Sequence, residues 1–257
     1  MQTTGNTILI TGGGSGIGRG LAEAFHALGN QVIISGRRQT ALDETTAANP
    51  GMQSLTLDAA DPASIRSFAT RLAGAYPSLN VLINNAGTMK PENILKNPDD
   101  LAASEAIITT NLLGPIRLTA ALLPVLAKQP RAAIINVTSG LAFVPLAMTP
   151  SYCATKAALH SYSESLRYQL RNTAIEVIEL IPPYVATTLM GDHQAADPRA
   201  MPLGDFITEV MDIFKTQPTP TEICVERVKP LRFLAEGGKQ KYDEFFNTLN
   251  AAMPPAE

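Results

Sequence analysis

Short apolar runs alternate with longer amphipathic segments along most of the chain. Six runs rich in isoleucine, leucine and valine begin at residues 7, 31, 52, 81, 132 and 175 and read TILIT, QVIIS, MQSLTL, VLIN, AAIINVTS and IEVIELI. Strands of this kind are nearly continuously apolar when helices cover both faces of a parallel sheet, and the intervening segments are long enough for crossover helices. The pattern therefore predicts an α/β fold with a doubly wound parallel β-sheet.

The helical segments include two long ones in the middle of the chain and one at its end. A helix is predicted from Pro150 to about Arg171, with Thr149 as its N-cap and the proline at its first position, where the missing N–H costs nothing. Another is predicted over about residues 100–127, and the stretch KQKYDEFFNTLNAAM has the spacing of a terminal helix. Because this length suffices for one large core, we expect a single domain over residues 1–257.

Composition and charge exclude several kinds of partner. Apolar residues make up 45% of the chain and charged residues 17%, with a net charge of -3 and a pI near 5.7. The chain thus has no basic field to attract nucleic acid or acidic lipid. The longest apolar runs, such as LTAALLPVLA from Leu118, are shorter than a membrane span. We expect a cytoplasmic protein that binds neither nucleic acid nor membrane.

The cysteine and histidine residues do not form a metal-binding pattern. Cys153 and Cys224 are far apart and belong to no Cys-x-x-Cys or Cys/His cluster, so neither a disulfide framework nor a zinc site is indicated. The histidines lack a metal-like partner at a useful spacing. His160 lies one helical turn beyond Lys156, but a lone helical histidine is more often packed or solvated than catalytic. We assign it no role and expect no metal.

A glycine-rich stretch, TGGGSGIGRG, follows the first apolar run and precedes a helical pattern. Glycines between a strand and a helix let the backbone approach a phosphate while helix N–H groups face its negative charge. Three known motifs do not fit: the P-loop lacks its Lys-Ser/Thr pair, the nucleophile elbow lacks G-x-S-x-G, and G-x-G-x-x-G fails in every register. What remains is T-G-x-x-x-G-x-G at Thr11, Gly12, Gly16 and Gly18. It predicts a dinucleotide site; the alternative is a flexible turn.

The stretch SYCATK places a tyrosine four residues before a lysine, at the start of the helix predicted from Pro150. On a helix, residues i and i+4 lie on one face, roughly 5 to 6 Å apart at Cβ, so the Lys156 ammonium could lie near the Tyr152 hydroxyl. A phenol has a pKa of about 10 and becomes useful in proton transfer only beside a fixed positive charge. The same spacing is typical of ordinary surface helices, so the pair alone does not indicate a catalytic site, and other motifs in the chain have to support one.

Several motifs occur in one order along the chain: the T-G-x-x-x-G-x-G loop, NNAG, then Asn111, Ser139, and Tyr152 with Lys156. In this order the chain resembles the short-chain dehydrogenase/reductase family, from residue 7 to about residue 190. The resemblance implies a Rossmann fold and an oxidoreductase that transfers a hydride between a nicotinamide cofactor and a carbonyl or alcohol. The alternative is a regulator that binds NADP(H) without turnover, because a fold can be kept while its chemistry is lost.

The resemblance gives each of four residues an expected role. Tyr152 donates a proton to the carbonyl oxygen, or accepts one in the reverse direction. Lys156 favours the tyrosinate by its charge and holds the nicotinamide ribose. Ser139 hydrogen-bonds the substrate oxygen, where negative charge develops. Asn111 anchors a water that relays protons to Lys156.

The resemblance also implies a cofactor site, and SGRR at the end of the second run favours NADP(H). The expected cofactor-binding residues are Gly12, Gly14, Ser15, Gly16, Ile17, Gly18, Arg37, Arg38, Asp58, Asn85, Ala86, Gly87, Tyr152, Lys156, Pro182, Val185 and Thr187. Enzymes that prefer NAD place a carboxylate where Gly36 stands, and a guanidinium can pair bidentately with phosphate oxygens. Arg37 and Arg38 are therefore expected to bind the phosphate on the adenosine ribose; the alternative is a pair of solvated loop charges.

Two features depart from the family pattern. After the sixth run the chain reads PPYVATTL, with Pro183 where the family usually has glycine. The family commonly ends with a seventh strand at a glycine-rich turn, whereas here Gly237 and Gly238 are followed by the helical stretch. We therefore expect six strands with a C-terminal helix in place of the usual seventh strand. Both features resemble the branch of reductases called DltE-like.

A region rich in methionine and aromatic residues follows the sixth run, over about residues 184–215. It is expected to be either a mobile lid beside the nicotinamide or an ordinary packed helix pair. As a lid, it would complete an apolar substrate pocket formed by Leu141, Phe143, Val144, Met148, Tyr184, Leu189, Met190 and Phe206. That pocket predicts a medium-sized, uncharged and largely apolar carbonyl or alcohol substrate.

The two long helices in the middle of the chain also suggest an assembly. By the resemblance, they would pair across a two-fold axis in a four-helix bundle, and two-fold symmetry is the commonest closed symmetry of soluble oligomers. We expect a homodimer. A tetramer is the alternative, although loss of the seventh strand would remove one surface through which tetramers of this family form.

Overall fold

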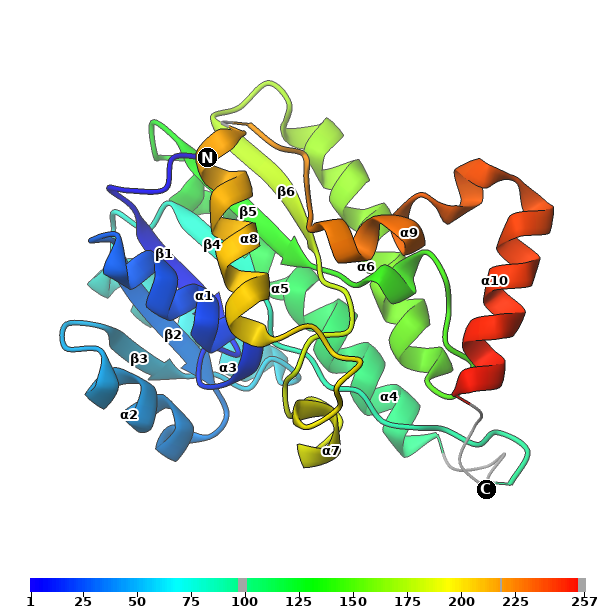
Figure 1. Cartoon of the computed structure of the whole chain (residues 1–257). Helices are drawn as coiled ribbons and strands as arrows, with labels where there is room; N and C mark the ends of the chain where they lie inside the picture. The colour runs from blue at the N-terminus through cyan, green and yellow to red at the C-terminus, as the bar shows by residue number, and fades with distance from the viewer. Residues whose placement is uncertain (97–100, 218, 254–257) are drawn as a thin grey trace.

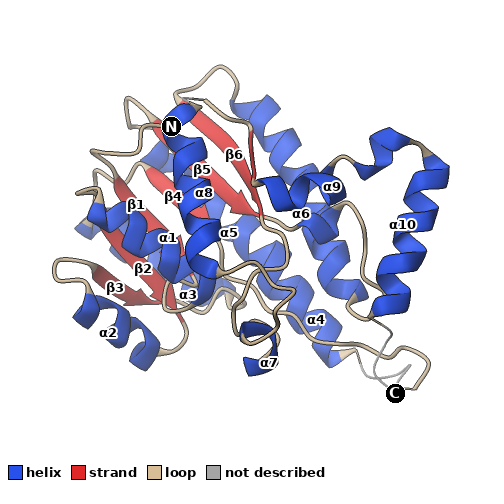
Figure 2. Cartoon of the chain, viewed as in Figure 1, coloured by secondary structure: helices blue, strands red, loops and turns tan. Residues whose placement is uncertain are grey.

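The computed structural model describes residues 1–96, 101–217 and 219–253. These residues form a parallel sheet of seven strands in the order β3-β2-β1-β4-β5-β6-β7, flanked by helices (Figures 1 and 2). The strands are β1 (Thr7–Thr11), β2 (Gln31–Gly36), β3 (Gln53–Thr56), β4 (Val81–Asn84), β5 (Ala132–Val137), β6 (Ile175–Ile181) and β7 (Glu222–Cys224). The first six lie on the six apolar runs, and the predicted doubly wound α/β fold is confirmed.

Helices cover both faces of the sheet because strand side chains alternate between two apolar cores. The helices are α1 (Gly16–Ala27), α2 (Gln39–Ala48) and α8 (Leu203–Thr216) on one face, and α3 (Pro62–Ala75), α5 (Gly114–Leu126) and α6 (Pro150–Leu170) on the other. Ile8 and Ile10 of β1 belong to the core with Phe25 of α1. Leu9, between them, belongs to the core with Phe68 of α3. Burial on both faces explains why β1 is an unbroken apolar run.

The sheet has one strand more than the six predicted. β7 pairs in parallel with the last three residues of β6, and Ile223 is its one buried side chain. Three residues with a single buried side chain give too short an apolar run to indicate a strand in the sequence. The predicted C-terminal helix is present downstream as α10 (Lys239–Ala252), so the chain has both the helix and the seventh strand.

The helix predicted over about residues 100–127 consists of α4 (Ala102–Ile108), the π-helical turn η1 (Thr109–Leu113) and α5; position 100 itself lies outside the described residues. π-Helical turns are rare and are frequent at functional sites. Among the described residues, Ala102–Leu126 is the one helical span long and apolar enough to cross a membrane, and 39% of its most apolar window is buried in the protein. Core helices of soluble proteins meet the same criterion.

The remaining short elements follow β5, β6 or β7. They are η2 (Gly140–Ala142), α7 (Asp192–Ala195), η3 (Glu226–Val228), α9 (Lys229–Arg232) and η4 (Leu234–Gly237). In Figure 1, α10 (red) stands apart from the helices that cover the sheet, and α7 lies beyond the lower ends of the strands.

Candidate active site

The carboxyl ends of β1, β4, β5 and β6 open into a cavity of about 850 Å³. β1 and β4 are neighbours at the topological switch point of the sheet, because the chain adds β2 and β3 on one side of them and β5, β6 and β7 on the other. Open α/β sheets bind ligands at such a point. The predicted site residues that line this cavity are Gly12, Ser15, Gly16, Ile17, Arg38, Asn85, Ala86, Gly87, Ser139, Leu141, Met148, Tyr152, Lys156, Pro182, Tyr184, Val185, Thr187, Leu189 and Met190. The fold thus brings most of the predicted residues to one place.

The loop after β1 needs glycine at three positions. Gly12 and Gly16 have φ angles of +68° and +52°, in the left-handed region that favours glycine. A Cβ on Gly18 would lie 2.3 Å from the Gly12 carbonyl oxygen, so a side chain there would push α1 away from the loop. The first turn of α1 therefore lies at the cavity, where its backbone N–H groups and helix dipole favour a phosphate.

Two predicted cofactor residues support this loop from behind. A Cβ on Gly14 would lie 3.2 Å from the backbone of Ala41 in α2, and Gly18 packs against the loop itself. Neither residue lines the cavity. In the structure, their contribution is close packing behind the loop rather than exposure to a ligand.

The NNAG turn after β4 is fastened to the glycine loop by Thr11, at the end of β1. The Thr11 hydroxyl accepts hydrogen bonds from the backbone N–H groups of Asn85 and Ala86, at 3.0 Å each. The Asn85 side chain donates in return to the Thr11 carbonyl oxygen at 2.9 Å. These bonds hold the two predicted cofactor segments side by side, with Gly87 at the cavity wall.

Tyr152, Lys156 and Ser139 form a cluster in the wall of the cavity. The first turns of α6 hold the tyrosine and the lysine together, with Lys156 Nζ 5.5 Å from the centre of the Tyr152 ring. Lys156 Nζ donates to the Val137 carbonyl oxygen at 2.7 Å, and the Ser139 side chain is near enough to the Tyr152 hydroxyl to lower its pKa by hydrogen bonding. Ser139 Oγ also accepts from the Leu141 N–H at 3.1 Å. A phenol, an ammonium and a hydroxyl therefore meet at one point.

Burial acts on both titratable groups of this cluster. Tyr152 is 7% exposed and Lys156 4%. Burial raises the pKa of Tyr152 above its usual value, and the hydrogen bond with Ser139 lowers it only in part. Burial lowers the pKa of Lys156 to about 8, against the charge of Glu179, which raises it. Burial therefore favours the protonated phenol, which is the form of a proton donor. That Lys156 favours the ionised tyrosine stays a prediction.

Asn111 lies in the π-helical turn η1, where its side chain is buried. Its Oδ1 accepts from the Thr88 N–H and its Nδ2 donates to the Thr88 carbonyl oxygen, both at 2.8 Å. Nδ2 also lies 3.4 Å from the Thr155 hydroxyl of α6. The side chain thus ties the segment after NNAG to the helix of Tyr152 and does not line the cavity. A water relay through Asn111 stays a prediction.

The start of α6 is fixed by a residue that the sequence did not indicate. Thr149, the predicted N-cap, makes no side-chain capping bond, and its hydroxyl lies 3.7 Å from the Cys153 sulfur. Glu92, after β4, instead accepts from the Ser151 N–H at 3.1 Å, from the Ser151 hydroxyl and from Ser104 of α4. The helix dipole stabilises a carboxylate there. Because this cap lies 59 positions away in the chain, no local pattern reveals it.

The substrate side of the cavity differs in part from the prediction. Five of the eight expected pocket residues line it, namely Leu141, Met148, Tyr184, Leu189 and Met190. Phe143 instead packs edge to face on His160, with ring centres 4.7 Å apart. Val144 and Phe206 are fully buried. Phe206 lies on α8, whose apolar face packs into the core against α1. The predicted lid is therefore split: its first half borders the cavity, and α8 is an ordinary core helix.

The buried side-chain amide of Gln194 fixes the segment between β6 and α7 at the cavity wall. Gln194 of α7 is 5% exposed and donates to the Val185 carbonyl oxygen at 2.9 Å and to the Thr187 hydroxyl at 3.2 Å. Its Oε1 accepts from the Met190 N–H at 3.0 Å. No pattern in the sequence indicates this residue, because a glutamine in a polar stretch is ordinary on a surface.

A charged pair stands at the same wall. Arg199 Nη2 lies 2.7 Å from Asp197 Oδ2, and the Tyr184 hydroxyl donates to that carboxylate at 3.2 Å. Hydrogen bonds from Arg199 hold the pKa of Asp197 well below its usual range. His193 lines the wall as well. This part of the cavity is more polar than the predicted apolar lid, although the guanidinium and the carboxylate neutralise each other.

The C-terminal helix completes the cavity. Leu249 of α10 and Met253 after it line the wall near Leu141 and Met148. Asn250 fastens the helix to the loop before α6 by donating to the Pro145 carbonyl oxygen at 3.2 Å. The sequence predicted this helix but not its place, because helical spacing does not tell which surface a helix covers.

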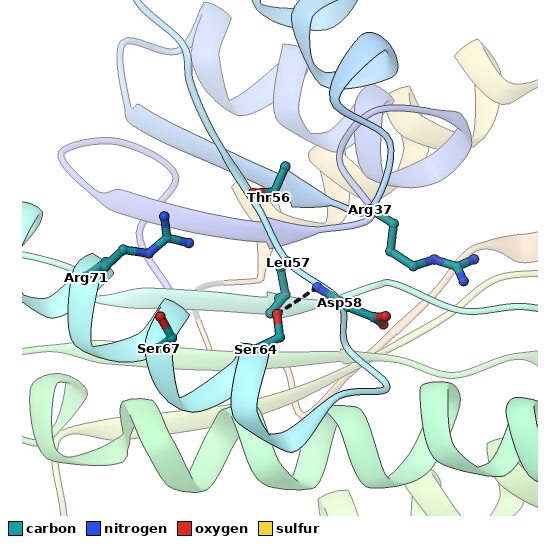
Figure 3. Close-up of a pocket in the computed structure, with 7 residues that line it drawn as sticks. All are labelled: Arg37, Thr56, Leu57, Asp58, Ser64, Ser67 and Arg71. Carbon is teal, nitrogen blue, oxygen red and sulfur yellow. Dashed lines mark hydrogen bonds between the residues drawn. The ribbon is translucent and has the colours of Figure 1, made fainter.

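A second cavity, of about 360 Å³, lies at the carboxyl ends of β2 and β3 (Figure 3). Arg37 and Asp58 lie on one side of it, and Arg71 of α3 lies on the other. The Asp58 N–H donates to the Ser64 hydroxyl at 3.1 Å, which fixes the turn that carries this carboxylate. Arg38 lines the larger cavity instead, so the two neighbouring arginines border different hollows.

One cluster among the described residues could hold a metal ion. His160, Glu179 and Glu222 bring ligand atoms within 4.8 Å of one another. Arg232 of α9 already donates two hydrogen bonds to Glu222, at 2.8 and 2.9 Å. The guanidinium therefore supplies positive charge to these carboxylates, and the cluster does not line either cavity.

Comparisons with known proteins agree with this geometry. The model of the short chain dehydrogenase family matches residues 6–198. The chain is 42% identical to the uncharacterized oxidoreductase DltE of Bacillus subtilis strain 168, over 97% of this chain and 98% of that protein. Its fold is similar to that of a short-chain dehydrogenase from Sphingobium yanoikuyae in complex with NADPH, with a TM-score of 0.78, 25% identity and 98% of each chain covered. A short chain dehydrogenase/reductase from Burkholderia phymatum in complex with NAD has the same TM-score of 0.78 at 20% identity, over 100% of this chain and 98% of that one.

Proposed function

The chain belongs to the short-chain dehydrogenase/reductase family, and from this membership we propose that it is an NADP(H)-dependent oxidoreductase that interconverts a carbonyl compound and its alcohol. One observation carries the proposal: Tyr152, Lys156 and Ser139 meet in a cavity that begins at a glycine loop. Family membership supports an oxidoreductase, and the cluster supports proton transfer to a substrate oxygen in the same cavity.

The cavity has the features that a dinucleotide needs. A phosphate fits against the first turn of α1, where Gly12 and Gly16 let the backbone come close. Asn85 and its neighbours line the next part of the wall. Lys156 carries three N–H donors, and among the described residues one of them is bonded, to the Val137 carbonyl oxygen, which leaves donors for ribose hydroxyls. These residues would hold the cofactor along the cavity.

Carbonyl reduction follows from the groups around Tyr152. A bound reduced nicotinamide supplies the hydride that reaches the carbonyl carbon. Tyr152, whose burial keeps its phenol protonated, donates its proton to the carbonyl oxygen. The Ser139 hydroxyl directs the same oxygen as negative charge develops on it. The Lys156 ammonium stabilises the phenolate that remains, because a nearby opposite charge favours the ionised form.

NADP(H) is proposed over NAD(H) because of the residues at the end of β2. Gly36 stands where a carboxylate would hold the ribose of NAD, and Arg37 and Arg38 follow it as exposed side chains. Related structures contain NADPH in one case and NAD in another, so the proposed preference rests on the arginines of this chain.

Uncharged, medium-sized ketones and aldehydes are the proposed substrates. Apolar side chains such as Leu141 and Met190 line the wall, and Asp197 and Arg199 neutralise each other there. In a panel assay that follows NADPH absorbance, we expect kcat/KM for such ketones to exceed that for dicarboxylates or phosphorylated sugars by roughly tenfold or more, because an unpaired charge is costly to bury.

Two outcomes of this panel would contradict the proposal. Strong selectivity for a dicarboxylate or a phosphorylated sugar would show that a charged group is recognised in the cavity. Tight binding of NADPH without turnover of any member would favour the alternative function, a regulator that binds the cofactor and performs no chemistry.

A homodimer is proposed through the helices α4, α5 and α6. Large apolar or aromatic side chains on or beside these helices are unusually exposed to solvent: 57% for Leu101, 41% for Ile108 and 68% for Tyr168. Light scattering at micromolar concentration should give twice the 27.3 kDa mass of the chain. A monomer at that concentration would contradict the dimer.

A further inference from the structure

Glu179 is a carboxylate inside the protein that the proposed reaction does not use. It lies in β6, and its exposed fraction is 0%. Burial of a carboxylate is costly unless it is hydrogen-bonded and near positive charge. Both of its oxygens have a partner: the Thr138 hydroxyl donates to Oε1 at 2.6 Å, and His160 Nδ1 lies 2.7 Å from Oε2. An ionised carboxylate only accepts, so the bond forms with the His160 tautomer that carries its proton on Nδ1.

The two residues that hold Glu179 are next to members of the catalytic cluster. Thr138 immediately precedes Ser139, at the end of β5. His160 follows Lys156 by one helical turn on α6. Glu179 therefore bonds the strand end that carries the serine and the helix that carries the lysine. A change at Glu179 can reach both segments without any contact to a substrate.

Charged and titratable groups approach Glu179 from three other elements. They are His160 and Lys156 on α6, Glu222 and Cys224 on β7, and Arg232 on α9. Arg232 is bonded to Glu222 through both carboxylate oxygens, and its guanidinium lies 4.6 Å from the centre of the Phe143 ring. The charge of Glu222 is thus matched by its own partner. Glu179 contacts α6 one helical turn beyond Lys156, through His160, and its negative charge raises the pKa of Lys156.

We propose that Glu179 is a positioning residue, whose buried carboxylate, fixed by Thr138 and His160, keeps Lys156 charged inside the protein. Lys156 is buried beside Tyr152, and its hydrogen-bond partner among the described residues is a neutral carbonyl oxygen, so it needs a nearby negative charge to keep its proton. Glu179 supplies that charge without blocking the cavity. The consequence for turnover rests on the proposed function, whereas the effect on the protonation of Lys156 does not.

The effect on pH dependence has a definite sign. A lysine is charged below its pKa and neutral above it, and the pKa of Lys156 is about 8 in the wild type. Carbonyl reduction that needs the ammonium is therefore lost as the pH rises through about 8. Removal of the negative charge at Glu179 lowers the pKa of Lys156 further, so the loss begins at lower pH.

The test compares the wild type with Glu179→Gln, which keeps the size of the side chain, and Glu179→Asp, which keeps its charge. NMR of isotope-labelled lysine side chains follows the titration of Lys156 in the purified enzyme without substrate, and Lys156→Arg assigns the signal. We expect the midpoint to fall by on the order of one pH unit in Glu179→Gln, the effect of a nearby opposite charge. It should fall by less in Glu179→Asp. The alkaline limb of kcat/KM for reduction should move in the same direction.

Glu176→Gln is the matched control, because Glu176 lies on the same strand, is 40% exposed and pairs with the N-terminal amine. It should leave the midpoint unchanged. Circular dichroism and NADPH binding check that each variant is folded. A folded Glu179→Gln variant whose Lys156 titrates as in the wild type overturns the proposal, and if Glu179→Gln does not fold, Glu179→Ala, which also removes the charge, is measured in its place. A shifted midpoint in a protein that reduces no carbonyl compound supports the role of Glu179 and contradicts the proposed reaction.

Discussion

Tyr152→Phe is expected to lower kcat at least about a hundredfold and to leave NADPH binding intact. A positioned acid contributes roughly a hundred- to ten-thousandfold to a rate, and Tyr152 is the protonated group beside Ser139 in the cavity. Phenylalanine keeps the ring in the apolar cluster to which Met89, Ile107 and Leu146 belong. The protein should therefore lose only about 1 kcal/mol of folding free energy, the net contribution of one hydrogen bond.

Tyr168→Phe is a suitable control for this change, because Tyr168 lies on the same helix, is 68% exposed and stacks on Arg171 far from the cavity lining. Its kcat should equal that of the wild type. NADPH consumption measures kcat, and fluorescence titration measures the Kd of NADPH. Near-normal turnover in Tyr152→Phe would rule out the tyrosine as the proton donor.

NADPH is expected to exceed NADH in kcat/KM by about ten- to a hundredfold. A charge-assisted contact with the ribose phosphate contributes roughly 1.5 to 3 kcal/mol, which corresponds to that factor. The double change Arg37→Ala with Arg38→Ala should remove most of the preference. A further Gly36→Asp should favour NADH, and the site accepts it, because the nearest atom to a Cβ there is Leu42 Cδ2 at an ordinary 3.7 Å.

Arg71→Ala is the control for the arginine variants. Arg71 lines the same smaller cavity as Arg37 but lies on α3, across from the end of β2 (Figure 3). It should leave the ratio of kcat/KM values for the two cofactors unchanged. Equal use of NADPH and NADH by the wild type, or an unchanged ratio in the double variant, would mean that these arginines do not bind the phosphate.

The glycine loop and the pair of Tyr152 and Lys156 could be predicted from the sequence, because each is formed by residues that are close together in the chain. The glycine loop requires a strand, a turn and a helix in succession, and Tyr152 and Lys156 require one helical turn between them. Each therefore has a motif that can be recognised within a few residues of sequence. Glu92, Gln194 and Glu179 act instead through contacts that the fold makes, often between distant segments. A lone polar residue in such a contact looks like any other in the sequence.

Two differences between sequence and structure have the same physical origin. The methionine and aromatic residues that place Phe206 in the predicted substrate pocket suit a core as well as a lid, and α8 packs into a core. The spacing of Tyr152 and Lys156 predicts a charge beside the phenol but not the burial that raises the pKa of Tyr152. Burial is a property of the whole fold, and sequence spacing does not determine it.

The central proposal, hydride transfer to a carbonyl carbon with Tyr152 as the proton donor, is tested most directly by isotope transfer. Wild-type enzyme is incubated with the best ketone of the panel and with NADPH in which both hydrogens of the reactive ring carbon are deuterium, so that either face of transfer is detected, and the alcohol is analysed by mass spectrometry. The predicted result is alcohol that carries the cofactor's deuterium on the former carbonyl carbon, formed at least about a hundredfold more slowly by Tyr152→Phe. Alcohol without deuterium, or no alcohol from any carbonyl compound while NADPH binds, would contradict the proposal.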